Sequence, residues 1–207
     1  CGSSWSGQSS SLPPYPRKRR RCPVSEAPDP KEFRRVMGLF ATGVTVVTAA
    51  VGERTHAMTA NAVMSVSLDP LLVCVSVGRS ARMNAFLEEA GGFALNILSE
   101  AQEDLSRYFA GMWQRPTPPD YRFVPWVGGP RLEGALASVG CAVERVVEAG
   151  DHRLFLGRVL ALHRSEGPLR PLLFFAGSYH RLQHPAASAR DPVEIWRPEE
   201  IQIFYEQ

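Results

Sequence analysis

Residues 58–77 read MTANAVMSVSLDPLLVCVSV, and this stretch decides the fold of the chain. Its first half carries small, mostly polar side chains among apolar neighbours: Thr59, Ala60, Asn61, Ser65 and Ser67. A break at Asp69-Pro70 is followed by an apolar run over 71–77 that is typical of a β-strand. The stretch predicts two buried strands joined by a short turn. A cluster of small hydrogen-bonding groups is useful on such strands when a flat molecule with polar edges lies against them.

Strand-like segments recur along the rest of the chain, and most of them are separated by turns. The segments expected to be strands are Val44–Ala50, His56–Ser67, Leu71–Val77, Phe93–Leu98, Ala135–Ala149, His152–His163 and Leu172–Ala176. They do not alternate regularly with helices, and no G-x-G-x-x-G follows a strand, which disfavours a Rossmann domain. The pattern favours a mainly β fold, a closed antiparallel β-barrel with peripheral helices.

Three helices are predicted from capping signals. Asp29 followed by Pro30 begins the first helix, which is expected to end at Gly43. Ser80 is the N-cap signal of a second helix. Ser99 begins a third, because the Gln three residues later completes a capping box.

A long connection is expected over residues 111–130, which hold five Pro and three Gly. Its aromatic side chains are available as lids or packing anchors: Trp113, Tyr121, Phe123 and Trp126. A loop of this length is often functional. Beyond the last core strand we expect an irregular segment over 185–198 and a short edge strand or helix over 201–205.

The chain has 207 residues, enough for one domain with a sizeable core. Residues 1–31 carry six Lys/Arg and two Asp/Glu, whereas the remainder carries 17 and 19. We expect a disordered basic N-terminal tail over 1–30, one domain over 31–183 and a C-terminal extension over 184–207. The negative body disfavours a nucleic-acid partner. The basic run 17–21 is either a localisation or polyanion-binding patch or a solvated part of the tail.

The composition indicates neither a membrane span nor a zinc or redox site built from cysteines. No apolar run reaches the ~18 residues that a membrane span needs, so no membrane partner is expected. The cysteines are Cys1, Cys22, Cys74 and Cys141, and no two have C-x-x-C spacing, which disfavours a zinc site or a redox pair. Cys74 and Cys141 are expected to be core residues, in agreement with a reducing, cytoplasmic location. Cys1 marks a fragment or a processed product, and a lipoprotein begins in the same way.

Reactive side chains are scarce. The five histidines form no H-E-x-x-H pair and no G-x-S-x-G is present, so we predict no metal centre and no serine hydrolase. We assign no catalytic side chain to the chain. This scarcity is typical of a protein whose cofactor carries the reaction.

Two further segments are candidate binding elements beside the small polar cluster. Ser80 and Arg82 lie just after a strand at a helix start, where they and the backbone N–H groups can hold a phosphate. The alternative for Ser80 is an ordinary N-cap. Gly150, Asp151 and His152 occupy a tight turn, where the Asp is either a simple turn former or part of a ligand contact with the His. The polar cluster itself has an alternative, a strand with one solvent-facing side.

Five motifs along the chain carry a family resemblance. They are FRRVMGLFATGVTVVT over 33–48, MTANAVMSVSLDPLLV over 58–73, FALNILSEAQEDLSRYF over 93–109, GDH over 150–152 and GSY over 177–179. In this order they resemble the flavin reductase family, whose fold is the FMN-binding split barrel of antiparallel Greek-key type. The resemblance covers Phe33 to about Leu182. Two residues depart from the family pattern: Ala62 stands where the family often has Ser or Thr, and Leu71 where it commonly has Pro.

The resemblance implies an NAD(P)H:flavin oxidoreductase, which reduces FMN or FAD with NADH or NADPH by hydride transfer to flavin N5. It implies a flavin ring along residues 59–61, a phosphate near Ser65, Ser80 and Arg82, and a dinucleotide held by His152. The full implied set of cofactor-binding residues is Met58, Thr59, Ala60, Asn61, Ser65, Ser67, Ser80, Ala81, Arg82, Gly150, Asp151, His152 and Tyr179. It also implies a homodimer with a flavin-dependent monooxygenase as partner.

Two other interpretations stay open. One is a flavoprotein of the same fold that holds FMN but uses another electron donor or acceptor. The element over 150–152 argues against it, because a passive flavin holder has no use for a nucleotide-binding turn. The other is a non-catalytic binding protein whose basic tail contacts nucleic acid or a partner, which the net negative body disfavours.

Overall fold

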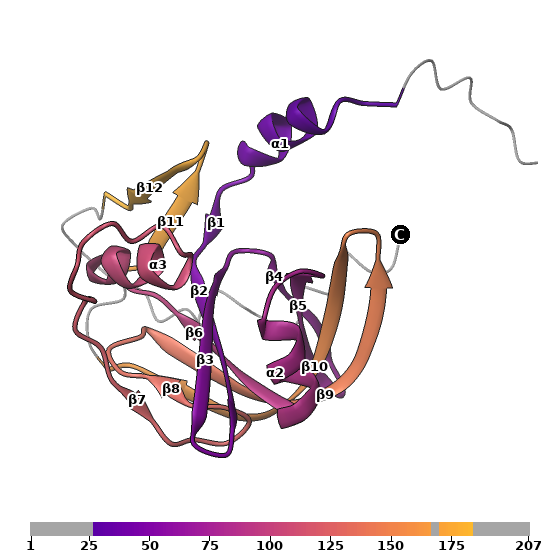
Figure 1. The fold of residues 1–207 in the computed structure, drawn as a ribbon, viewed down its shortest axis with the longest axis vertical. Coiled ribbons are helices and arrows are strands. Elements are labelled where there is room, and N and C mark those ends of the chain that lie inside the picture. Colours follow the sequence, from indigo (N-terminus) through magenta and orange to yellow (C-terminus); the bar gives the residue numbers. More distant parts are fainter. Residues whose placement is uncertain (1–26, 167–169, 184–207) are drawn as a thin grey trace, which may run out of the picture.

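A seven-stranded antiparallel sheet in the order β3-β2-β6-β9-β10-β5-β4 forms the centre of the molecule (Figure 1). The structure, a computed structural model, describes residues 27–166 and 170–183. The strands of this sheet are β2 (Thr45–Val51), β3 (Arg54–Ala60), β4 (Val63–Leu68), β5 (Leu71–Gly78), β6 (Gly92–Ile97), β9 (Ala137–Ala149) and β10 (His152–Arg164). The predicted antiparallel, mainly β fold is confirmed. The C-terminal extension, the element expected over 201–205 and most of the predicted tail lie outside the described residues.

Among the residues that the structure describes, five shorter strands form two small sheets beside the large one. β1 (Thr42–Gly43), β11 (Leu172–Phe175) and β12 (Ser178–Arg181) make up one of them. β7 (Phe123–Val124) pairs with β8 (Arg131–Leu132) in the other. The long connection expected over 111–130 therefore contains a strand near its end. β12, which the sequence did not predict as a separate strand, carries Tyr179.

In the described part of the chain three α-helices accompany the strands: α1 (Pro30–Gly38), α2 (Met83–Ala90) and α3 (Glu103–Phe109), the last preceded by a 3₁₀ turn over Glu100–Gln102. The Asp29 carboxylate accepts the N–H of Lys31 at 3.2 Å, as an N-cap should. The capping box of Ser99 and Gln102 is present as predicted. α1 buries none of its residues and extends away from the sheet (Figure 1).

Two helix boundaries differ from the prediction. The first helix ends at Gly38 instead of Gly43, because Thr42 and Gly43 form strand β1, which pairs with β11. The second helix begins at Met83, and Ser80 is not its N-cap. The side chain of Asn84 instead binds the carbonyl groups that precede the helix.

The barrel is open between its two edge strands. Within the described ranges β3 pairs with β2 alone and β4 with β5 alone, and two residues, Asn61 and Ala62, connect β3 to β4. The single strand predicted over 56–67 is therefore wrong. The chain changes edges there because the Ala60 carbonyl accepts the Thr45 hydroxyl at 2.6 Å, while the Ala62 carbonyl accepts the N–H of Ser76 at 3.0 Å. We call this opening the seam.

Two apolar clusters fill the molecule. The larger lies inside the barrel and receives Met83 and Leu87 from α2. The smaller consists of Val44, Val46, Leu98, Leu105, Leu132 and Leu172. Cys74 and Cys141 are buried free thiols, as predicted, and burial raises the pKa of Cys141 to about 12. The larger cluster anchors α2 and the smaller one α3, and these are the two helices beside the predicted site.

Candidate functional site

The end of β3 and the start of the seam hold four predicted flavin-binding residues. Along β3 the side chains alternate, so Met58 and Ala60 pack against the larger cluster. The Thr59 hydroxyl faces the other way and donates to the carbonyl of Ser106 in α3 at 2.7 Å. Asn61 is exposed, and its side chain makes no hydrogen bond within the described part of the chain. Its amide is thus available to a ligand.

A cavity of about 140 Å³ opens at this position. It is lined by Val44, Thr59, Ala60, Asn61, Ala110, Met112, Phe174 and Tyr179. The cavity brings Tyr179 to three predicted residues of β3 and the seam. Four lining residues were missed by the sequence analysis: Val44, Ala110, Met112 and Phe174. The signal for Met112 was its place in the long loop, whereas nothing in the sequence marks Phe174.

Tyr179 is held in place by α3. Its hydroxyl lies 2.8 Å from Ser106 Oγ, and the Arg107 guanidinium lies 4.8 Å from the centre of its ring. Because the Ser106 carbonyl also accepts the Thr59 hydroxyl, one residue of α3 connects two walls of the cavity. α3 therefore sets the distance between Thr59 and Tyr179.

The loop over residues 78–82 joins β5 to α2. The side-chain amide of Asn84 donates to three carbonyl oxygens of this loop, so Asn84 organises the start of α2. The side chains of Ser80 and Arg82 are exposed and make no hydrogen bond among the described residues. Ala81 is partly buried against the larger cluster. The loop leaves both predicted phosphate ligands unpaired.

The positive charge of Arg82 affects His56 on β3. Burial and the nearby Arg82 together lower the pKa of His56, which lies two residues before Met58 on β3. His56 also packs on Phe86 of α2, with ring centres 5.0 Å apart. The loop over 78–82 thus lies close enough to β3 for the positive charge of Arg82 to act on it, a charge that would also attract an anion there.

Gly150, Asp151 and His152 form the tight turn between β9 and β10. Gly150 has φ = 63°, in the left-handed region that glycine adopts without strain. His152 Nδ1 lies 2.8 Å from Asp151 Oδ1, and this hydrogen bond lowers the pKa of Asp151. His152 is the ladder partner of Gly78, so the turn lies directly beside the loop over 78–82. The structure therefore brings together two predicted binding elements, the loop with Ser80 and Arg82 and the turn over 150–152.

Comparison with known proteins now decides the family. A family model described as "flavin reductase like domain" matches residues 37–183. The chain belongs to the flavin reductase family.

Relatives of this flavin reductase span almost the same region. The NADH-dependent FMN reductase AsuE2 of Streptomyces nodosus subsp. asukaensis is 43% identical over 162 residues, which are 76% of this chain and 88% of that protein. The reductase component of 4-hydroxyphenylacetate 3-monooxygenase from Thermus thermophilus is 40% identical over 155 residues, which are 74% of this chain and 97% of that protein.

Solved structures agree with the split-barrel fold. The flavin reductase PheA2 in its native state superposes with a TM-score of 0.71 at 46% identity and covers 75% of this chain and 99% of its own. The NADH:FAD oxidoreductase SgcE6 of Streptomyces globisporus, in complex with NAD and FAD fragments, gives a TM-score of 0.69 at 38% identity, covering 79% of this chain and 100% of its own.

Ser65 and Ser67 lie on β4 of this flavin reductase and do not line the small cavity. Ser65 is exposed, and Ser67 Oγ accepts the N–H of Asp69 at 3.2 Å. A register shift against β5 lies between the two serines. The structure therefore does not bring these predicted residues to the cavity at Thr59.

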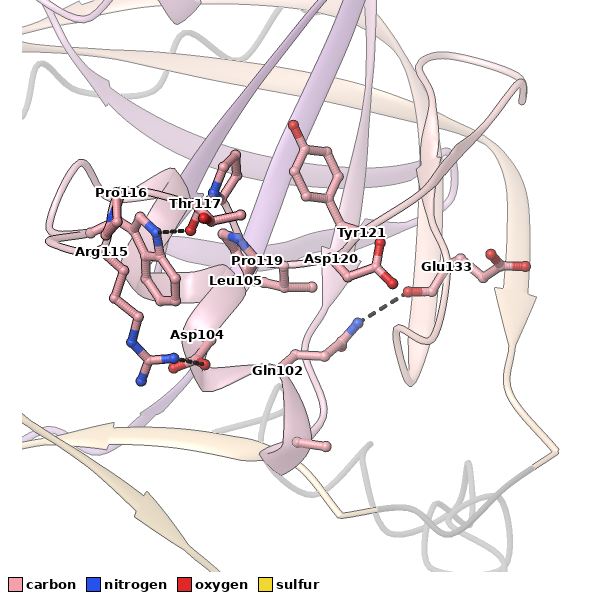
Figure 2. A pocket seen from close by; sticks show the side chains of 13 residues that line it. Gln102, Asp104, Leu105, Arg115, Pro116, Thr117, Pro119, Asp120, Tyr121 and Glu133 are labelled. Atoms are coloured by element: carbon pink, nitrogen blue, oxygen red, sulfur yellow. Dashed lines mark hydrogen bonds and ion pairs between the residues drawn. The ribbon is translucent and has the colours of Figure 1, made fainter.

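A larger cavity of the flavin reductase, about 710 Å³, lies on a different face of α3 (Figure 2). None of the predicted site residues lines it. Four of its polar side chains are already paired: Trp113 Nε1 with the Thr117 carbonyl at 2.9 Å, Arg115 with Asp104 at 3.5 Å, and Gln102 Nε2 with the Glu133 carbonyl at 3.1 Å. The pair of Arg115 with Asp104 joins the long loop to α3, whereas the Trp113 bond lies within the loop and the Gln102 bond reaches the residue after β8. All three have a packing role.

The described residues contain no group of three or more His, Cys, Asp or Glu placed to hold a metal ion. Among the same residues, no helix is both long and apolar enough to cross a membrane. Taken together, the candidate site consists of four parts: the seam, the small cavity, the loop over 78–82 and the turn over 150–152.

Proposed function

We propose that this flavin reductase oxidises NADH, in preference to NADPH, reduces FMN or FAD, and supplies the reduced flavin to a flavin-dependent monooxygenase. The observation that carries the proposal is the direct contact between the loop over 78–82 and the turn over 150–152, next to β3. One element suits a phosphate and the other a dinucleotide. Two relatives, an NADH-dependent FMN reductase and the reductase component of a monooxygenase, support NADH as donor and a monooxygenase as acceptor.

A flavin nucleotide fits the groups that the chain leaves unpaired. Ala60 and Asn61 are small, so a planar ring can approach the backbone at the seam, and the Asn61 amide can meet a polar edge of the ring. Ser80 and Arg82 can bind the phosphate, with the start of α2 adding a favourable dipole. In this proposal Tyr179 and α3 form the wall behind the ring.

The chain's own contribution is orientation. When bound, the flavin accepts a hydride at N5 from the reduced nicotinamide. His152 helps to hold the dinucleotide at the rim of the turn, and ionised Asp151 orients its imidazole through the 2.8 Å hydrogen bond. No acid–base side chain is needed, because holding the two rings in contact supplies most of the rate enhancement.

Exposed apolar side chains favour a homodimer. On β4, Met64 is 57% and Leu68 75% exposed, and around α1 Phe33 is 61% and Phe40 70% exposed. Apolar groups gathered on one strand and one helix are typical of a covered interface. A second copy of the chain would cover them beside the seam. We further propose a cytoplasmic catalytic unit over residues 31–183, in which the buried thiols of Cys74 and Cys141 stay reduced.

A coupled assay tests the function. Purified protein is mixed with NADH and FMN, and oxidation is followed at the nicotinamide absorbance band, with FAD and NADPH in parallel. We expect oxidation that requires both protein and flavin and is faster with NADH. Absence of flavin-dependent oxidation with both donors would overturn the proposal.

The same assay separates the two ligands. His152→Ala should raise the KM for NADH about fivefold to tenfold, the value of one lost hydrogen bond, and change the Kd of FMN much less. His163→Ala, at the opposite end of β10, is the matched control and should change neither. Equal losses for both ligands in His152→Ala would contradict the role of the turn.

A further inference from the structure

Two loops of the proposed site emerge from neighbouring strands. β5 ends at Gly78, β10 begins at His152, and these residues are partners in the antiparallel ladder. A Cβ added to Gly78 would lie 3.8 Å from His152 Nε2, so the imidazole lies against this glycine. We call the loop over 78–82 the flavin-phosphate loop and the turn over 150–152 the nicotinamide turn, after their roles in the proposed function. The two are therefore in contact.

Arg79 makes three contacts to the hairpin of β9 and β10. Its backbone N–H donates to the Asp151 carbonyl at 3.0 Å, and its Nε donates to the Gly150 carbonyl at 2.8 Å. Its Nη2 lies 2.7 Å from the Glu148 carboxylate. An exposed ion pair alone is weak, but two hydrogen bonds to main-chain carbonyls also fix direction. The loop cannot shift without moving the turn.

Asn84 holds the loop from the buried side. The residue is 8% exposed, and its Nδ2 donates to three backbone carbonyls: Gly78 at 2.7 Å, Ala81 at 2.9 Å and Arg79 at 3.3 Å. In a trans peptide the N–H of the following residue points away from the carbonyl. The N–H groups of Ser80 and Arg82 therefore face away from Asn84, and neither donates a backbone hydrogen bond within the described residues. Two amide donors are left for a phosphate.

Arg153 closes the network on the helix side. It lies 3.0 Å from Glu148, the same carboxylate that pairs with Arg79, and it also pairs with Glu88 of α2. Its side chain is 19% exposed, which reduces solvent screening of both pairs. Since Asn84 belongs to the first turn of α2, the contacts run from the loop to the turn, on to α2 and back to the loop.

We propose that Arg79 and Asn84 are positioning residues that join the flavin-phosphate loop to the nicotinamide turn, so that flavin and dinucleotide bind cooperatively. The inference rests on the proposed function. A phosphate that orders the loop also orders the turn, which lowers the entropic cost of binding the dinucleotide. By reciprocity the dinucleotide must strengthen flavin binding by the same factor.

The test measures the Kd of FMN by flavin fluorescence with and without saturating NAD⁺, which cannot reduce the flavin. For the wild type we expect NAD⁺ to tighten FMN binding about fivefold to tenfold, a typical coupling between sites. Arg79→Met keeps the aliphatic stem and removes both side-chain contacts, so the factor should fall below about twofold. Arg54→Met is the matched control, because Arg54 pairs with Glu89 of α2 at 3.2 Å. It should keep the wild-type factor.

Asn84→Ala tests the other half of the network. The Kd of FMN should rise about tenfold, since the loop amides lose their orientation toward the phosphate. Binding of riboflavin, which has no phosphate, should change less than about twofold. Thermal unfolding of each variant checks that it is folded, and Arg79→Met, an exposed site, provides a second route if Asn84→Ala is unstable.

Each outcome has one meaning. A working enzyme whose coupling factor is unchanged in Arg79→Met, or absent in the wild type, overturns the inference and leaves the function standing. Equal loss of FMN and riboflavin binding in Asn84→Ala overturns the role of Asn84. A wild type that neither binds FMN nor oxidises NADH with it overturns the proposed function as well.

Discussion

Helix α3 has cavities on two of its faces, and they differ in more than size. The larger measures about 710 Å³, and four polar side chains around it are already paired (Figure 2). The smaller measures about 140 Å³ and joins the seam, where the Asn61 side chain makes no hydrogen bond among the described residues. Cavity volume alone would therefore place a binding site on one face of α3, whereas the unpaired polar group lies on the other.

The difference shows how a binding site is distinguished from imperfect packing. A ligand gains binding energy from polar groups that have no partner beforehand and from an apolar wall that it can cover. Groups that already bind one another must first be separated, which costs as much as the ligand returns. By this criterion we propose the smaller cavity, with the seam, as the part of the flavin site next to α3.

A bulky side chain on each face gives the largest expected contrast. Asn61→Trp places an indole where the flavin ring is proposed to lie, and misplacing reacting rings by about 1 Å costs roughly 100-fold in rate. We expect kcat/KM for flavin-dependent NADH oxidation to fall by about this factor. Asp120→Trp, at an exposed position of the larger cavity, should stay within about twofold of wild type. Equal losses would remove the distinction between the two faces.

Removing one arginine from each region, the loop over 78–82 and the larger cavity, gives the next largest contrast. Arg82→Ala should raise the Kd of FMN about tenfold, because a charge-assisted hydrogen bond is worth roughly 1.5–3 kcal/mol. Riboflavin binding should stay the same, since it lacks the phosphate. Arg115→Ala removes a residue already paired with Asp104 and should change neither value. Isothermal titration with both ligands measures this, and a weaker riboflavin complex in Arg82→Ala would speak against a phosphate contact.

Tyr179→Phe sharpens the comparison through stability. The change removes the hydrogen bond to Ser106 and should lower the free energy of unfolding by about 1 kcal/mol. Tyr121→Phe, on the larger cavity, should lower it by less than about 0.5 kcal/mol, as is usual for surface positions. Urea denaturation of both variants measures the difference. A larger loss for Tyr121 would mean that the long loop, and not Tyr179, fixes α3.

Asp104→Asn should have the smallest effect. Its ion pair with Arg115 is 3.5 Å long, and both side chains are more than half exposed. Such pairs contribute about 0–0.5 kcal/mol. We expect unchanged kinetics and a nearly unchanged melting temperature. A clear drop in kcat would show that the larger cavity takes part in the reaction.

The long strands of the sheet and the capping box at Ser99 could be predicted because each depends on neighbours in the sequence. Alternation and apolar runs located β5, β9 and β10 to within two residues, and Ser99 marked the third helix. The turn at Gly150 was likewise readable, since a tight hairpin turn with positive φ favours glycine.

The remaining features depend on residues far apart in the sequence. The break at Asn61 is set by hydrogen bonds from Thr45 and Ser76, and no local pattern marks it. Ser80 was read as an N-cap by its type, yet Asn84 holds the loop because its amide reaches carbonyls on the buried side. Phe174 reaches the cavity only through the pairing of β11 with β1 and β12.

The open seam has a consequence for the lifetime of the complex. Because β3 and β4 have no hydrogen bonds to each other in the described ladder, a flavin can depart past them without breaking a strand pair. In the site we propose, its residence time would be set by the few contacts of the loop and turn, not by opening of the barrel. An enzyme that must hand its product to a separate protein in every cycle needs this kind of fast exit.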